Sequence, residues 1–181
     1  MLTIKVPEIE TFDEVENRFH RVKATSLTLE HSLLSVSKWE SKWHKAFLGR
    51  NEKTMEETLD YIRCMTLTQN VDPNVYKYLP ANAVQEIINY IQDPMSATYF
   101  GDRNNPRGSH ETVTSELIYY WMVALQIPFN PCQKWHLNRL MTLIRICEIK
   151  NSPPKKMSKS AIYARNRSLN NARRAAMHTK G

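Results

Sequence analysis

The sequence predicts a mostly α-helical protein: a helical domain with an αα-hairpin core, a small N-terminal β element and a basic C-terminal helical arm. Only 4 of the 181 residues are glycine, which disfavours a chain of many tight β-turns. From about Ser32 to Ile149, apolar residues recur at spacings of three and four, the period of helices that pack on a core. The excess positive charge is concentrated at the C-terminal end.

The N-terminal β element begins at Leu2–Val6, where LTIKV alternates and is rich in β-branched residues. Pro7 ends this strand, because proline has no N–H to donate to a strand ladder. We expect residues 19–23, and part of SLTLEH at residues 26–31, to pair with it in a small sheet.

A long helix is predicted from about Ser32. Its apolar stripe consists of Leu33, Val36, Trp39, Trp43 and Phe47. Lysines interleave with the two tryptophans, so this stretch also fits a stacking platform for nucleic acid. Because the aromatic residues share one helical face, we favour core packing beside the lysine stems.

Four shorter signals follow along the chain. Residues 54–57 form a capping-box pattern that opens a helix. Asp72 and Pro73 predict the start of a short helix that runs through Leu79. Another helical stripe consists of Val84, Ile87, Ile88 and Ile91 and is stopped by Asp93-Pro94. Residues 101–110, GDRNNPRGSH, predict a loop.

The densest apolar segments form the predicted αα-hairpin. Thr112 or Thr114 caps its first helix, which ends at Pro128. Asn130-Pro131 starts the second helix, which runs to about Ile149. The predicted core anchors of the hairpin are Trp121, Trp135 and Leu140.

The chain is expected to divide into a helical domain with the small β element, residues 1–150, and a basic C-terminal arm, residues 151–181. The proline pair at residues 153–154 disfavours helix just before it and separates the two. Residues 150–181 hold nine Lys and Arg and no acidic residue, whereas residues 1–149 hold 16 basic and all 18 acidic residues. From about Ser158 to His178 the arm can be helical. Its apolar stripe of Ile162, Leu169, Ala172 and Ala176 is thin, so such a helix needs a surface to pack on.

The sequence contains no glycine-rich phosphate loop, nucleophile elbow or HExxH motif. Glu56, Glu57 and Asp60 could form an acid–base cluster, but carboxylates near a helix N-terminus are expected from the helix dipole alone. We therefore expect no catalytic residue, no enzymatic activity and no cofactor.

Cys132 and His136 share a predicted helical face and, with Cys64 or Cys147, could hold zinc. Zinc sites usually show paired short ligand spacings, which are missing, so we expect no metal. The first residues, MLTIKVPEIE, have no apolar signal segment, and we expect free thiols in a reducing compartment. The longest apolar run, residues 117–129, is shorter than the roughly 20 residues of a membrane span, so no membrane partner is expected.

The candidate partner-binding residues all lie in the basic arm: Lys155, Lys156, Arg165, Arg167, Arg173 and Arg174. Clustered Lys and Arg attract phosphates, which allows a weak nucleic-acid contact. Asn, Ser, Leu and Ala interrupt the charges and no DNA- or RNA-reading motif is present, so an arm that lies on a neutral or acidic protein fits as well. A solvated helix or a disordered tail without a partner is the third alternative.

Four stretches carry a family resemblance: LEHSLLSVSKWESKWHKAFL, ETLDYIRCMTLTQNVDP, TSELIYYWMVALQIPFNPCQKWHLNRLMTLIRICEIKNSPPKKMS and RNRSLNNARRAAMHTKG. Together they resemble a small late-gene protein of tailed bacteriophages, found near the tail tube and tape-measure components. The resemblance runs from about Leu29 to the end. It implies a tail-assembly role, like that of a tape-measure chaperone, or a structural role in the tail or virion. It gives no individual functional residue.

These observations lead to three hypotheses. The first is a non-enzymatic bacteriophage tail-assembly protein that acts through protein–protein contacts, masking apolar helical surface of its partner in the groove beside the αα-hairpin. The second is a structural virion protein, a tail or neck component, whose basic arm binds neighbouring subunits. The third is a nucleic-acid-binding accessory protein. The implied partners are other phage tail proteins, tape-measure-like or tube subunits, with this chain an oligomer in assembly. The implied location is the host cytoplasm during assembly, or the virion.

Overall fold

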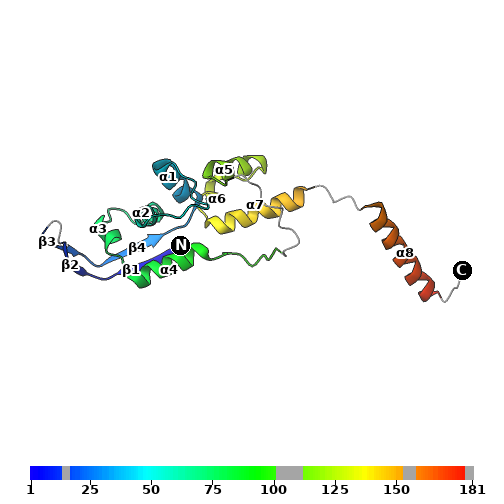
Figure 1. The fold of residues 1–181 in the computed structure, drawn as a ribbon, viewed down its shortest axis with the longest axis horizontal. Helices are drawn as coiled ribbons and strands as arrows, with labels where there is room; N and C mark the ends of the chain where they lie inside the picture. The colour runs from blue at the N-terminus through cyan, green and yellow to red at the C-terminus, as the bar shows by residue number, and fades with distance from the viewer. Residues whose placement is uncertain (14–16, 101–111, 153–157, 178–181) are drawn as a thin grey trace. The chain divides into compact units, whose positions relative to one another are not determined.

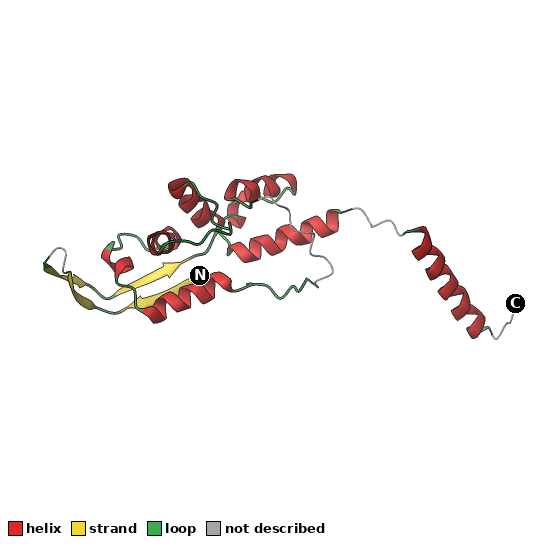
Figure 2. Cartoon of the chain, viewed as in Figure 1, coloured by secondary structure: helices red, strands yellow, loops and turns green. Residues whose placement is uncertain are grey.

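The computed structural model describes residues 1–13, 17–100, 112–152 and 158–177. It is mostly helical with a small N-terminal β element, so the predicted fold class is confirmed (Figures 1 and 2). The chain divides into two compact units, Met1–Glu148 and Ile149–Gly181.

The β element is a long two-stranded ribbon. Strand β1 (Leu2–Val6) pairs with β4 (Thr25–Leu29), and β2 (Ile9–Asp13) pairs with β3 (Arg18–Val22), both antiparallel. Val6 faces Thr25 and Ile9 faces Val22, so the register continues across the interruption at Pro7 and Glu8. The interruption coincides with the proline, which cannot donate a ladder hydrogen bond.

One predicted strand pairing is right and one is wrong. Residues 25–29, which overlap the predicted SLTLEH stretch, do pair with β1. Residues 19–23 do not, because residues 18–22 pair instead with β2, a strand that the sequence analysis did not predict. Strand β2 has the sequence IETFD, and its Glu and Asp are residue types that are depleted in strands, so the sequence pattern did not indicate a strand there.

The helices of the described residues are α1 (Leu33–Trp43), α2 (Met55–Met65), α3 (Asn74–Lys77), α4 (Ala81–Gln92), α5 (Ser115–Ala124), α6 (Phe129–Cys132), α7 (Leu137–Asn151) and α8 (Lys159–Ala176). Ser32, Thr54, Thr114 and Ser158 cap α1, α2, α5 and α8, and each side chain accepts an N–H from three residues further on. The capping box predicted at residues 54–57 is confirmed, because Thr54 and Glu57 each accept the other's backbone N–H. The predicted loop at residues 101–110 lies outside the described residues.

The second helix of the predicted αα-hairpin starts later than expected. Asn130 is extended, with φ −98° and ψ 124°, because the residue before a proline disfavours the helical region. Residues 133–137 make backbone hydrogen bonds to residues 31–34. The Leu34 N–H donates to the Gln133 carbonyl at 3.3 Å, and the Leu137 N–H donates to the His31 carbonyl at 2.7 Å. These bonds keep this segment out of a helix, so α7 begins only at Leu137.

The core of the first unit lies between the β1–β4 pair and the surrounding helices, with α4 along β1 (Figure 1). Its least exposed side chains include Leu27, Leu29, Leu33, Trp39, Met65, Ile87, Ile118, Met122, Leu137, Leu140 and Ile144. None of the helices in the described ranges is both long and apolar enough to cross a membrane.

The predicted anchors differ in their burial. Leu140 is fully buried, whereas Trp121 and Trp135 are only partly buried and pack against the core. Trp135 lies in the irregular segment before α7, where the Arg139 guanidinium lies 4.6 Å from its ring centroid. The deeply buried tryptophan is Trp39, which is 1% exposed and donates its Nε1–H to the Glu57 carbonyl at 2.8 Å. Core packing, the favoured interpretation of the tryptophan–lysine stretch, is therefore confirmed at Trp39.

Candidate protein-binding site

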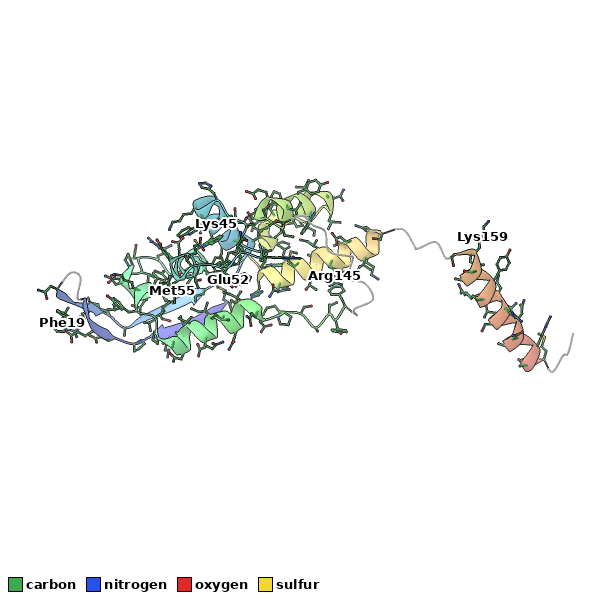
Figure 3. All side chains as sticks on the ribbon, in the orientation of Figure 1. Phe19, Lys45, Glu52, Met55, Arg145 and Lys159 are labelled. Carbon is green, nitrogen blue, oxygen red and sulfur yellow. The ribbon has the colours of Figure 1, made fainter. Side chains whose placement is uncertain are left out.

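The C-terminal helix α8 is the element that carries most of the predicted site residues. It spans Lys159–Ala176, begins at the Ser158 cap and has no buried residue (Figure 3 labels Lys159). Its two largest aliphatic side chains, Ile162 and Leu169, are 43% and 46% exposed. They are seven residues apart and therefore share one face of the helix. The result is an apolar stripe that is open to solvent.

The predicted arginines divide between two faces of α8. Arg167 and Arg174 are seven residues apart and lie together on the face away from Ile162 and Leu169. Lys159 is three residues before Ile162 and lies between the two faces. Arg165 and Arg173 lie beside the apolar stripe, because they are three and four residues from its members. Lys155 and Lys156 lie outside the described residues.

The charge of α8 limits what it can do by itself. It carries Lys159 and four arginines, and no acidic residue. Arg173 and Arg174 in its last turn interact favourably with the helix dipole. Its first turn has no acidic side chain that would do the same at the N-terminal end. Most of the stability of a helix in a protein comes from packing of an apolar face, and no residue of α8 is buried. A partner with an apolar surface and acidic side chains would satisfy both faces of α8.

Two acidic residues of α2, Glu57 and Asp60, have structural roles. Glu57 accepts hydrogen bonds from the Lys45 ammonium and the Thr54 backbone, and the Lys45 hydrogen bond in particular lowers the pKa of its carboxyl group. Burial alone would raise the pKa of Asp60, but hydrogen bonds from Lys42 at 2.5 Å and from Trp43 Nε1 at 2.9 Å lower it overall. The two carboxylates thus tie α2 to α1 and its C-terminal turn.

A buried polar cluster joins four separate segments, a grouping that the sequence analysis did not identify. The rings of His31 and His136 are edge to face, with centroids 5.0 Å apart. His31 Nδ1 lies 2.5 Å from the Tyr61 hydroxyl on α2. The His136 Nε2–H donates to the Tyr90 carbonyl on α4 at 2.9 Å, and the Tyr90 hydroxyl donates to Glu30 at 2.7 Å. The cluster therefore cross-links the segment before α1 with α2, α4 and the start of α7.

This cluster keeps His31 neutral. Burial, reinforced by nearby His136, lowers the pKa of His31 to about 3. Both ring nitrogens of His136 are engaged, since Nδ1 accepts the Asn138 backbone N–H at 3.3 Å and Nε2 donates to Tyr90. The two histidines are 2% and 6% exposed, so their nitrogens are used within the fold. No pattern in the sequence pairs residue 31 with residue 136, which only tertiary packing brings together.

The predicted zinc candidates are dispersed. Cys132 is buried, Cys64 and Cys147 are partly buried, and all three are free thiols. Within residues 1–13, 17–100, 112–152 and 158–177, no three His, Cys, Asp or Glu side chains are grouped to hold a metal ion.

Comparison of the chain with protein-family models, with curated proteins and with solved structures finds no match.

Proposed function

We propose that this chain is a non-enzymatic assembly protein that acts through protein–protein contacts, with α8 as its partner-binding segment. The observation that carries the proposal is that α8 has no buried residue, that all its charged side chains are basic and that its apolar stripe is open to solvent. The sequence resemblance supplies the biological setting, which is tail assembly in a bacteriophage. In this proposal residues 1–150 are the folded domain and residues 151–181 are the arm.

The chemistry of α8 defines the surface that it would bind. Ile162 and Leu169 call for an apolar groove, and Arg165 and Arg173 beside them call for carboxylates at the rim of that groove. On the opposite face, Arg167 and Arg174 add a long-range attraction to an acidic partner, which accelerates association and weakens with salt. Pairing of α8 with a second α8 is disfavoured, because both helices carry only positive charge.

A nucleic-acid accessory is the second candidate. The observation that favours it is the alignment of Lys159, Tyr163, Arg167 and Arg174 along one face, where cations could contact phosphates and the tyrosine could stack on a base. The apolar stripe opposite has no role in this alternative, which is why we place it second.

Site-specific photo-crosslinking in cells that assemble the particle tests the proposal. A photoreactive phenylalanine analogue replaces Tyr163, which is 73% exposed on α8. The matched control is the same replacement at Tyr99, which is 84% exposed in the first unit. We expect an acidic tail protein to cross-link at position 163 and not at position 99, and Leu169→Asp to abolish that cross-link.

Two other outcomes would contradict the proposal. Cross-links at position 163 that disappear after nuclease treatment would favour the nucleic-acid alternative. Equal cross-linking yields to the same proteins at positions 99 and 163 would mean that α8 does not bind a specific partner. A further measurement separates an assembly factor from a virion component: the factor is absent from purified particles, whereas a structural protein is present at fixed stoichiometry.

A further inference from the structure

The β2–β3 ribbon carries an aromatic pair on its surface that the fold does not cover. Phe12 and Phe19 face each other across the two strands, and their ring centroids are 5.0 Å apart. Phe12 is 47% exposed and Phe19 is 69% exposed. Figure 3 shows Phe19 at the outer end of the ribbon, away from α1 and α5. Exposed aromatic pairs of this kind are typical of contact surfaces, because large rings provide much of the energy of protein interfaces.

The same face carries opposite charges on its two strands. Glu10 faces Arg21 across the ribbon, and both are exposed. They lie two residues from Phe12 and Phe19, so all four side chains share one face. Arg21 also forms an ion pair with Glu8, just before β2. This face thus carries an acidic residue on β2 and a basic residue on β3 opposite each other, and the aromatic pair lies beside them toward the outer end of the ribbon.

This arrangement is self-complementary. A two-fold axis parallel to the strands, between two stacked ribbons, places β2 of each copy over β3 of the other. Glu10 of one copy then meets Arg21 of the other twice, and the two aromatic pairs pack together. Turning one copy end to end instead would place acidic strand over acidic strand, which like charges disfavour.

We propose that this ribbon face, Glu10, Phe12, Phe19 and Arg21, is a self-association site that binds the same face of a second copy of this chain. In the described part of the chain β2 and β3 pair only with each other, and a two-stranded ribbon is marginal in water unless its face is packed. Two such faces form an interface smaller than the roughly 1,200 Å² of a standard stable complex, so the dimer is weak and concentration-dependent. The site is separate from α8 and does not depend on the function proposed for it.

Sedimentation velocity of the full chain from about 1 to 500 µM tests the site. We expect a monomer–dimer equilibrium that weakens as salt rises from about 0.1 to 0.5 M. Phe19→Ser should weaken the dimer at least tenfold, whereas Phe129→Ser, at a 44% exposed aromatic residue elsewhere, should leave it unchanged. Circular dichroism melts would show that each variant is folded.

Two charge variants make the test specific. Glu10→Lys gives a face with two positive charges and Arg21→Glu a face with two negative charges, so each variant alone should remain monomeric. An equimolar mixture should form heterodimers at least as readily as the wild type. The proposal is overturned if the wild-type chain is monomeric throughout, or if the two variants associate no better together than apart. It is also overturned if Leu169→Asp on α8 abolishes the dimer, which would place association in the arm.

Discussion

The Glu40 carboxylate on α1 accepts the backbone N–H of Ser115 at the start of α5, with 2.7 Å between Oε2 and N. Its other oxygen, Oε1, accepts the Phe47 N–H at 2.8 Å. Glu40 is only 7% exposed, so one buried side chain fixes the position of α5 and of the turn after α1. Neither N–H has a helical partner, because one belongs to the first turn of a helix and the other follows a helix.

Glu40→Ala should therefore lower the free energy of unfolding by about 2–5 kcal/mol, since two buried N–H groups lose their acceptor. Glu40→Gln should cost less, because the amide oxygen still accepts one of the two. Urea melts followed by circular dichroism would measure both. Glu86→Ala, at an exposed carboxylate in the middle of α4, is the control and should change stability by less than about 0.5 kcal/mol. A Glu40→Ala loss as small as that of the control would contradict the role assigned to this side chain.

The buried His31 side chain should make stability fall with acid. The pKa of His31 lies near 3 in the folded chain and near 6.5 in the unfolded chain, so between these values the unfolded chain binds more protons at this residue. The stabilisation is complete above pH 6.5 and is lost as the pH falls, by at most about 1.4 kcal/mol per pH unit. Unfolding free energies between pH 7 and 5 would measure the slope. His31→Gln should reduce the slope relative to the wild-type chain. Equal slopes in the variant and the wild-type chain would assign the acid sensitivity to other groups.

The tryptophans should differ in their contribution to stability. Trp39→Ala should cost about 3–5 kcal/mol, because a fully buried ring and its hydrogen bond to Glu57 are lost. On the apolar pattern alone, Trp135→Ala would be expected to cost as much. Since Trp135 is only partly buried, we expect it to cost less than about 3 kcal/mol. Denaturant melts of the two variants under one set of conditions decide this ranking, and a larger loss at Trp135 would reverse it.

The C-terminal arm should contribute little to the stability of the first unit. A chain truncated after Pro154 should unfold within about 1 kcal/mol of the full chain, the size expected for surface changes. Two observations support this expectation: the chain divides between Glu148 and Ile149, and α8 has no buried residue. Thermal and urea melts would check it, and insolubility of the truncated chain would mean that the arm is part of the fold. In a phage complementation assay the same truncation should abolish assembly.

The sequence predicted the helices best where local chemistry alone determines them. Ser32, the Thr54–Glu57 box and Thr114 mark real helix starts, because a capping side chain acts within three residues of its own position. The arm helix was likewise predicted within about two residues at each end. The charge pattern of the sequence identified the candidate basic residues at 165, 167, 173 and 174. Their division between two faces follows only once residues 159–176 are known to form one continuous helix.

What the sequence could not predict depends on contacts between distant residues. Strand β2 was missed because its acidic residues suit a strand only when a basic strand lies opposite, as Arg21 lies opposite Glu10. The late start of α7 depends on backbone bonds to His31 and Leu34, about a hundred residues earlier. The His31–His136 pair was missed for the same reason, since each histidine is isolated in the sequence.

The bonds between residues 31–34 and residues 133–137 also determine when the fold can be completed. They close a loop of about a hundred residues, whose entropy must be lost before the first of these bonds forms. On the ribosome, the β ribbon and α1 emerge long before α7. The carbonyl of His31 therefore lacks its hydrogen-bond donor, the Leu137 N–H, until residue 137 has been synthesised. We therefore expect the nascent chain to expose its apolar N-terminal half for most of its synthesis, a period in which a cellular chaperone could bind it.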